Sequence, residues 1–171
     1  QHGIAYLTED RKGDGLFLNM TIRENLVAPS LPAFTKAQGL LDFRRIEGFA
    51  QQAARDYDIV TPSLTKKVSN LSGGNQQKCL IAMWMGINPR VILFDEPTRG
   101  VDVGARAEIY HKLRELSQSG VGIVMISSDL PELIGMCDRI LVMHQGRITG
   151  ELSREEFSEE RIMTYAAGLQ T

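Results

Sequence analysis

Residues 91–98 read VILFDEPT, four consecutive apolar residues followed by two acids. An apolar run of this length without alternation is typical of a strand buried on both faces of a parallel sheet. Because such sheets bind ligands at the carboxyl ends of their strands, the pattern predicts Asp95 and Glu96 at a ligand-binding edge. Taken alone, it is equally typical of an acidic turn that follows a strand.

The segments after this strand alternate between helix and strand patterns, whereas those before it are mainly helical. We predict strands at 4–7, 91–94, 121–126, 139–143 and 147–152, and helices at 21–27, 44–57, 102–117, 130–136 and 158–167, with a further helix opening within 71–78. The order predicts an α/β fold with a parallel core sheet, an attached helical lobe and a C-terminal β-hairpin plus helix. The lobe is expected at about 20–88, and the core portion at 1–19 and 89–171.

Several of these elements carry local signals. Thr21 and Glu24 have the spacing of a capping box, Asp102 precedes its helix as an N-cap, and Gln145-Gly146 is a hairpin turn. Residues 121–126 are predicted to form a second buried strand. The expected buried helix faces are Ile46, Phe49, Ala53 and Tyr57 in one helix, Leu80, Met83, Trp84 and Ile87 in the next, and Ile109, Leu113 and Leu116 in the third.

Residues 71–78, LSGGNQQK, place two glycines directly at the start of a helix. The first N–H groups of that helix are bare at the positive end of its dipole, which is a favourable seat for a phosphate. Ser72 adds a hydroxyl donor at the same end. A Ser/Gly segment that merely caps the helix is the alternative, and it is the stronger interpretation of SGG taken alone.

The composition is that of a globular protein, with 43% hydrophobic and 23% charged residues. A net charge of −2 argues against nucleic acid as a partner, because such proteins usually carry a basic surface. No apolar run approaches the roughly 20 residues of a membrane-spanning helix. Cys79 and Cys137 lie in apolar segments without a CxxC pattern, and we expect both to be reduced buried thiols.

Together these motifs resemble the ATP-binding cassettes of the ABC family, and in particular the second half of the tandem ATPases that drive bacterial ribose, galactose and xylose importers. The resemblance covers the whole chain and is most specific at EDRK (9–12) with Gly15-Leu16, NQQK (75–78) and DEPTRGVDVG (95–104). It implies the P-loop NTPase fold, with ATP and Mg²⁺ as ligands.

The resemblance also implies a role for each motif. Asp95 and Glu96 are the Walker B acids: Asp95 is placed to hold Mg²⁺ through its water shell, and Glu96 to polarise the attacking water as the catalytic residue. Residues 99–102 form the D-loop, and residues 7–11 the Q-loop, which couples the nucleotide state to the membrane subunit. The residues expected at the nucleotide are Leu71, Ser72, Gly73, Gly74, Gln76, Asp102, Glu9 and Ser128.

Three departures from the family pattern stand out. Glu9 occupies the position of the Q-loop glutamine, and Ser128 that of the switch histidine. The chain has three histidines, His2, His111 and His144. None of them is at a position from which it could replace the switch histidine, and each is expected at the surface. The chain contains no GxxxxGK[ST], so the phosphate-binding Walker A segment is expected upstream of Gln1.

The function implied is that of the ATP-hydrolysing subunit of a sugar importer, an ATPase peripheral to the cytoplasmic face of the bacterial inner membrane. Its expected partners are a second ABC domain, a transmembrane permease subunit and, indirectly, a periplasmic sugar-binding protein, with no nucleic acid. By itself the chain is expected to be inactive. The alternatives are a non-transport cassette ATPase and a docking module without catalytic activity.

Overall fold

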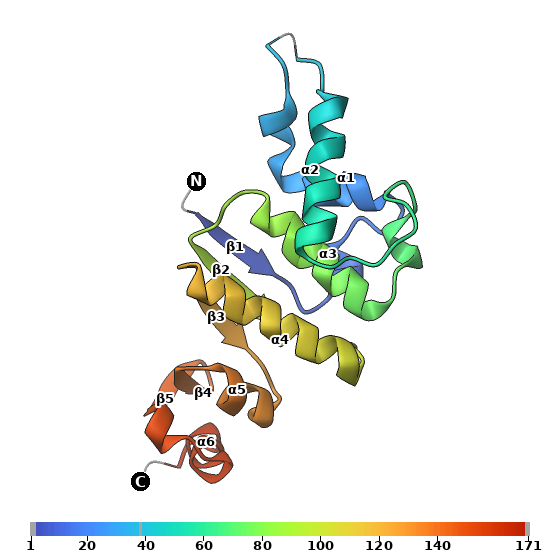
Figure 1. Ribbon diagram of the computed structural model, residues 1–171. Helices are drawn as coiled ribbons and strands as arrows, with labels where there is room; N and C mark the ends of the chain where they lie inside the picture. The colour runs from blue at the N-terminus through green and yellow to red at the C-terminus, as the bar shows by residue number, and fades with distance from the viewer. Residues whose placement is uncertain (1–2, 38, 170–171) are drawn as a thin grey trace. The chain divides into compact units, whose positions relative to one another are not determined.

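The computed structural model describes residues 3–37 and 39–169 (Figure 1). The chain divides into two compact units, residues 1–126 and residues 127–171. Among the described residues, no helix combines the length and the apolar character that crossing a membrane requires.

The first unit is built on a three-stranded parallel sheet. Its strands β1 (Ile4–Leu7), β2 (Val91–Asp95) and β3 (Gly122–Ile126) lie in the order β1-β2-β3. Leu93 of β2 pairs with Tyr6 on one side and Val124 on the other. The predicted parallel core is therefore confirmed, and β2 is its central strand.

One face of this sheet packs into the hydrophobic core of the first unit. Ala5, Leu7, Ile92 and Phe94 are buried on it. Helices α3 (Gly73–Met85) and α4 (Val103–Gln118) run alongside the sheet (Figure 1), with α3 beside β1 and α4 beside β3. The long crossover connections that parallel strands require place these helices over the sheet.

The opposite face differs from the sequence prediction. The register collects Ile4, Tyr6, Val124 and Ile126 on it, and each of these side chains is about half exposed, from 49% to 56%. The expectation of a strand buried on both faces was therefore wrong for 121–126, whereas in the central strand β2 the residues on this face, Val91 and Leu93, are half-buried. Apolar content alone does not reveal which face a helix covers, whereas the two-residue period of a strand assigns alternate residues to opposite faces.

The segments between β1 and β2 are helical. Besides α3, they comprise a π-type turn η1 (Arg11–Gly15), α1 (Ile22–Val27), the 3₁₀ segments η2 (Ala28–Phe34) and η3 (Val68–Asn70), and α2 (Phe43–Asp56). Both bonds of the Thr21–Glu24 capping box are formed, as predicted. Ile46 and Ala53 are buried as expected, while Phe49 is half-buried with its ring 5.2 Å from that of Phe34.

Ile87 is the clearest error in the predicted helix faces. The helix that carries Leu80 and Met83 ends at Met85, with Gly86 as its C-cap. Ile87 therefore lies beyond the helix and is 37% exposed. In α4, by contrast, Asp102 caps the helix and Ile109, Leu113 and Leu116 are buried, as predicted.

The second unit consists of α5 (Leu130–Met136), a hairpin of β4 (Arg139–His144) and β5 (Arg147–Ser153), η4 (Arg154–Glu156) and α6 (Glu159–Ala166). Its core is a cluster of Ile140, Val142, Leu152 and Ile162. Gln145 and Gly146 both have positive φ, 46° and 77°. Two such residues suit the tight turn of an antiparallel hairpin, so the predicted hairpin is confirmed.

Candidate functional site

The LSGG segment forms the start of α3. Ser72 is the N-cap, and its Oγ accepts a hydrogen bond of 3.3 Å from the N–H of Asn75. The first N–H groups of a helix have no partner within the helix. The cap provides an acceptor for the N–H of Asn75. The N–H groups of Gly73 and Gly74 are left for a ligand at the positive end of this helix of 13 residues. Capping and phosphate binding are therefore compatible here.

Close packing gives both glycines a second reason for their identity. A Cβ on Gly74 would lie 2.6 Å from the Cβ of Ala105, at the start of α4. A Cβ on Gly73 would lie 2.8 Å from the carbonyl oxygen of Gly100. The start of α3 is thus pressed against the turn that leads into α4. The sequence pattern predicted phosphate binding or helix capping for this segment, and it did not predict this contact.

Gln76 and Leu71 face the protein more than the solvent. Gln76 is 4% exposed, and its Nε2 lies 3.4 Å from the carbonyl oxygen of Val68 and 3.3 Å from that of Leu71. Leu71 is half-buried and ends η3 as its C-cap. These contacts fix the entry of the chain into α3, and a direct role of either side chain at the nucleotide stays a prediction.

The two acids of VILFDEPT lie at the carboxyl end of β2. Tyr6 donates a hydrogen bond of 2.8 Å to Oδ2 of Asp95, and this bond is the main cause that raises the pKa of the tyrosine. Glu96 has a φ of +49°, which is uncommon for a residue other than glycine. Its N–H donates to the carbonyl oxygen of Ile126 at 2.8 Å, so the ends of β2 and β3 are joined at this residue.

The chain turns sharply after Glu96. The N–H of Arg99 donates to the carbonyl oxygen of Glu96 at 3.1 Å, and Gly100 has a φ of +64°. Asp102 is exposed and caps α4 by accepting a bond of 3.0 Å from the N–H of Ala105. The side chain of Glu9, at the predicted Q-loop position, forms an ion pair with that of Arg99. The Q-loop segment and the D-loop segment are therefore neighbours.

Ser128 belongs to the second unit and is exposed. Next to it, Ser127 donates a hydrogen bond to the buried carboxylate of Glu132 and accepts one from the N–H of Asp129. A role of Ser128 in the site that contains Glu96 stays a prediction, because the two residues lie in different units.

The remaining sequence predictions concern histidines, cysteines and metal ligands. His111 is exposed as predicted, His144 is half-buried with Nδ1 2.7 Å from the carbonyl oxygen of Ala166, and His2 lies outside the described residues. Cys79 is buried, and Cys137 is half-buried. Within residues 3–37 and 39–169, no three or more His, Cys, Asp or Glu side chains gather in a way that could hold a metal ion.

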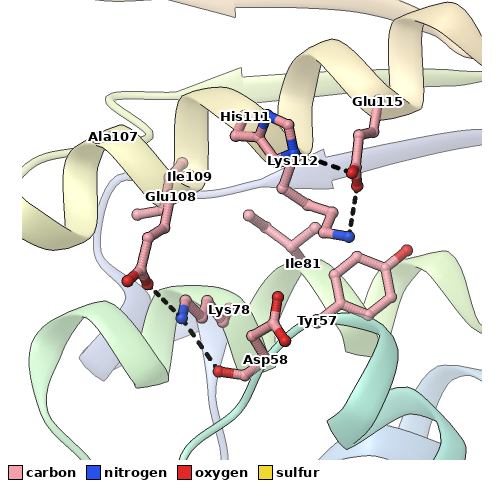
Figure 2. Close-up of a pocket in the computed structure, with 10 residues that line it drawn as sticks. All are labelled: Tyr57, Asp58, Lys78, Ile81, Ala107, Glu108, Ile109, His111, Lys112 and Glu115. Atoms are coloured by element: carbon pink, nitrogen blue, oxygen red, sulfur yellow. Dashed lines mark hydrogen bonds and ion pairs between the residues drawn. The ribbon is translucent and has the colours of Figure 1, made fainter.

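A separate hollow of about 380 Å³ lies between α3 and α4 (Figure 2). Lys78 of α3 pairs with Glu108 of α4 at 2.5 Å, and Lys112 pairs with Glu115 at 2.6 Å while its Nζ lies 5.2 Å from the centre of the Tyr57 ring. Each lysine on the wall is thus already neutralised by a neighbouring carboxylate. We therefore interpret this hollow as part of the packing interface between α3 and α4. Lys78 of the NQQK motif contributes the ion pair with Glu108 that joins the two helices.

This combination of a parallel sheet, a glycine-started helix and two acids at a strand end matches a known class of protein. The sequence model of the ABC transporter family matches residues 1–99, and the chain belongs to this family. The ribose import ATP-binding protein RbsA of Bacillus licheniformis is 51% identical over 168 residues, which are 98% of this chain and 34% of that protein. RbsA of Bacillus subtilis is 50% identical over 166 residues, covering 97% of this chain and 34% of that protein. The chain thus spans about a third of the length of these curated relatives.

Solved structures confirm the predicted ABC ATPase fold. The ATP-binding cassette MJ0796, in a dimeric post-hydrolysis state bound to ADP and Pi, has a TM-score of 0.73 at 24% identity, over 90% of this chain and 64% of that one. MJ1267, an ATP-binding cassette of an ABC transporter, has a TM-score of 0.75 at 22% identity, over 95% of this chain and 68% of that one.

Proposed function

We propose that this chain is part of the ATP-hydrolysing subunit of a bacterial sugar importer, with ribose as the leading substrate. The observation that carries the proposal is an identity of about 50% to proteins named as ribose import ATP-binding proteins, extending over 97–98% of the chain. The geometry is consistent with it, because the start of α3, the turn at 99–102 and the acids after β2 lie in one compact unit.

In this proposal the start of α3 meets the γ-phosphate of an ATP molecule that a second ABC domain holds. Two such domains pair head to tail, and the dimeric state of MJ0796 offers a precedent within the fold. Ser72 and the N–H groups of Gly73 and Gly74 contact ATP more strongly than ADP, because ADP lacks the group that they bind. Binding of ATP therefore favours the closed pair, and hydrolysis releases it.

Asp95 and Glu96 serve the nucleotide of their own domain, whose phosphate-binding loop we assign to residues outside the 171. The residues fit a magnesium ion, since Mg²⁺ in nucleotide sites is bound by one or two carboxylates together with water and phosphates. Asp95 would hold the ion, which neutralises charge on the phosphates, while the phenol of Tyr6 orients its carboxylate. Glu96 accepts a proton from the attacking water, and its backbone bond to Ile126 keeps the carboxylate at the strand end.

The proposal includes the partners that importers of this type use. A transmembrane permease subunit would receive the movement of the Q-loop segment around Glu9, and a periplasmic sugar-binding protein would deliver the sugar to it. The ATP-hydrolysing subunit to which this chain belongs would then act at the cytoplasmic face of the inner membrane.

Transport measured in proteoliposomes tests the proposal. The full-length protein is reconstituted with its permease and binding protein, and uptake of radiolabelled ribose, galactose and xylose is followed with and without internal ATP. We expect uptake of ribose that depends on ATP and is lost in Ser72→Arg, whose side chain fills the phosphate seat. ATP hydrolysis that is independent of the permease, with no uptake of any of the three sugars, would contradict the proposal.

A further inference from the structure

We infer that Arg11 is a positioning residue: its guanidinium fastens the turn at Arg99–Gly100 to the start of α3, so that the loop carrying Glu9 and the phosphate-facing helix start hold one fixed geometry. The inference rests on the proposed function of the α3 start and adds a residue whose role is to hold that site in place.

The hydrogen bonds of Arg11 define the clamp. Nη1 donates to the carbonyl oxygen of Arg99 at 2.6 Å, and Nη2 donates to that of Gly100 at 2.9 Å. Two consecutive carbonyl groups are thus held by the two arms of one rigid guanidinium. Arginine suits this task because its donors form a planar fork, whereas lysine offers a single flexible ammonium group.

The surrounding glycines make room for the same group. A Cβ on Gly73 would lie 3.0 Å from Nη2 of Arg11, and a Cβ on Gly100 would lie 3.3 Å from it. The guanidinium therefore fills the space between the start of α3 and the turn, at the point where both backbones lack a side chain.

The burial of Arg11 indicates that its charged guanidinium positions the two carbonyl groups rather than stabilising the fold. Arg11 is only 9% exposed, burial lowers its pKa, and its Nε is buried without a hydrogen-bond partner among the described residues. A buried cation without a carboxylate partner is costly, and an apolar side chain of similar volume often stabilises a fold as well or better. The arrangement is explained more simply by the need to hold two carbonyl groups in register than by a contribution to stability.

The clamp extends to the Q-loop segment through the backbone. The N–H of Arg11 donates to the carbonyl oxygen of Glu9 at 3.1 Å, and the N–H of Leu16 donates to that of Arg11 at 2.8 Å. Asp10 caps the turn by accepting from the N–H groups of Lys12 and Gly13. Since Glu9 also pairs with the Arg99 side chain, two independent contacts join this loop to the same turn.

The test compares Arg11→Met, Arg11→Lys and a matched control, Arg23→Met, in the full-length protein. Arg23 pairs with Glu47 at 2.8 Å, away from this clamp, so the control removes an arginine contact elsewhere in the same unit. The first readout is amide hydrogen exchange without nucleotide at residues 75–77 and 99–104, with α2 as the internal reference for the Arg11 variants and α6 for Arg23→Met, because Glu47 lies in α2. The second is kcat and KM for ATP.

We expect Arg11→Met to speed exchange at 75–77 and 99–104 by about tenfold or more, the equivalent of losing about one hydrogen bond to a charged group, with α2 unchanged. Arg11→Lys should show a smaller increase, and Arg23→Met none in these segments. In Arg11→Met, kcat should fall by about 10²-fold with little change in KM, as for a misplaced catalytic geometry.

Wild-type exchange at both segments in Arg11→Met would overturn the inference, and so would faster exchange spread evenly over the unit. An ATPase rate that stays at the wild-type value despite faster local exchange would also overturn it. If the wild-type protein hydrolyses no ATP while local exchange still responds to Arg11→Met, the clamp stands and the proposed function falls.

Discussion

The contact between Gly74 and Ala105 gives a quantitative test of how the signature helix is packed. A Cβ on Gly74 would sit 2.6 Å from the Cβ of Ala105, a separation that neither short side chain can relieve by rotating. Overpacking of this kind costs about 1–3 kcal/mol, and alanine returns about 0.5–1 kcal/mol of helix preference over glycine. We therefore expect Gly74→Ala to lower the free energy of unfolding by about 1–2 kcal/mol.

A double-mutant cycle separates this clash from other effects. Ala105→Gly alone should cost about 0.5–1 kcal/mol, yet in the Gly74→Ala background it removes the clashing atom and should restore stability. The coupling between the two positions is then about 1–3 kcal/mol and favourable. Gly48→Ala in α2 is the matched control: no atom lies within 4 Å of the added methyl group, so it should stabilise by about 0.5–1 kcal/mol.

Urea denaturation of the 171-residue chain, followed by tryptophan fluorescence, measures these values. Trp84 is the only tryptophan in the sequence and lies on α3, so its signal reports on the first unit. The slope of the transition should stay constant across the variants while the midpoint moves. If Gly74→Ala behaves like Gly48→Ala, or if the two positions show no coupling, the close approach of α3 to α4 is not as described.

In the full-length protein, Ser72→Arg should abolish ATP hydrolysis more completely than Glu96→Gln, because the arginine blocks closure of the pair, and equal near-complete loss in steady-state rates would contradict this. Burial raises the pKa of Cys79 to about 12, so at pH 8 its thiolate is scarcely populated. Iodoacetamide should therefore modify the half-buried Cys137 first. Mass spectrometry that shows Cys79 labelled first would contradict the burial of Cys79. The half-exposed apolar sheet face should make the 171-residue chain self-associate, and Val124→Lys should reduce the mass seen by light scattering, whereas a monomeric wild-type chain would refute that expectation.

Local and periodic signals predicted much of the fold. The capping box at Thr21, the N-cap at Asp102 and the Gln145-Gly146 turn were all predicted because each depends on a few neighbouring residues. The acids at the carboxyl end of β2 were also predicted, since a short apolar run fixes where that strand ends.

Features that depend on distant residues were not predicted. Arg11 sits in a charged EDRK run that is typical of an exposed turn, and its acceptors are carbonyl groups 88 and 89 residues further along the chain. The half-exposed face of β3 was missed for a similar reason, because apolar residues at 122–126 do not reveal on which side a helix lies. Gln76 was missed although its partners are near in sequence: its amide points inward to the carbonyl groups of Val68 and Leu71, a contact that no spacing rule indicates.

We propose above all that the bare N–H groups at the start of α3 bind the γ-phosphate of ATP held by a partner domain. Amide hydrogen exchange at Gly73 and Gly74 measures this most directly, in full-length Glu96→Gln protein that hydrolyses ATP slowly. With Mg-ATP, exchange of these amides should slow by about tenfold or more, the equivalent of a hydrogen bond to a charged group, while ADP leaves it unchanged. Exchange that is the same with ATP, with ADP and without nucleotide, in protein shown by filter binding to hold ATP, would contradict the account.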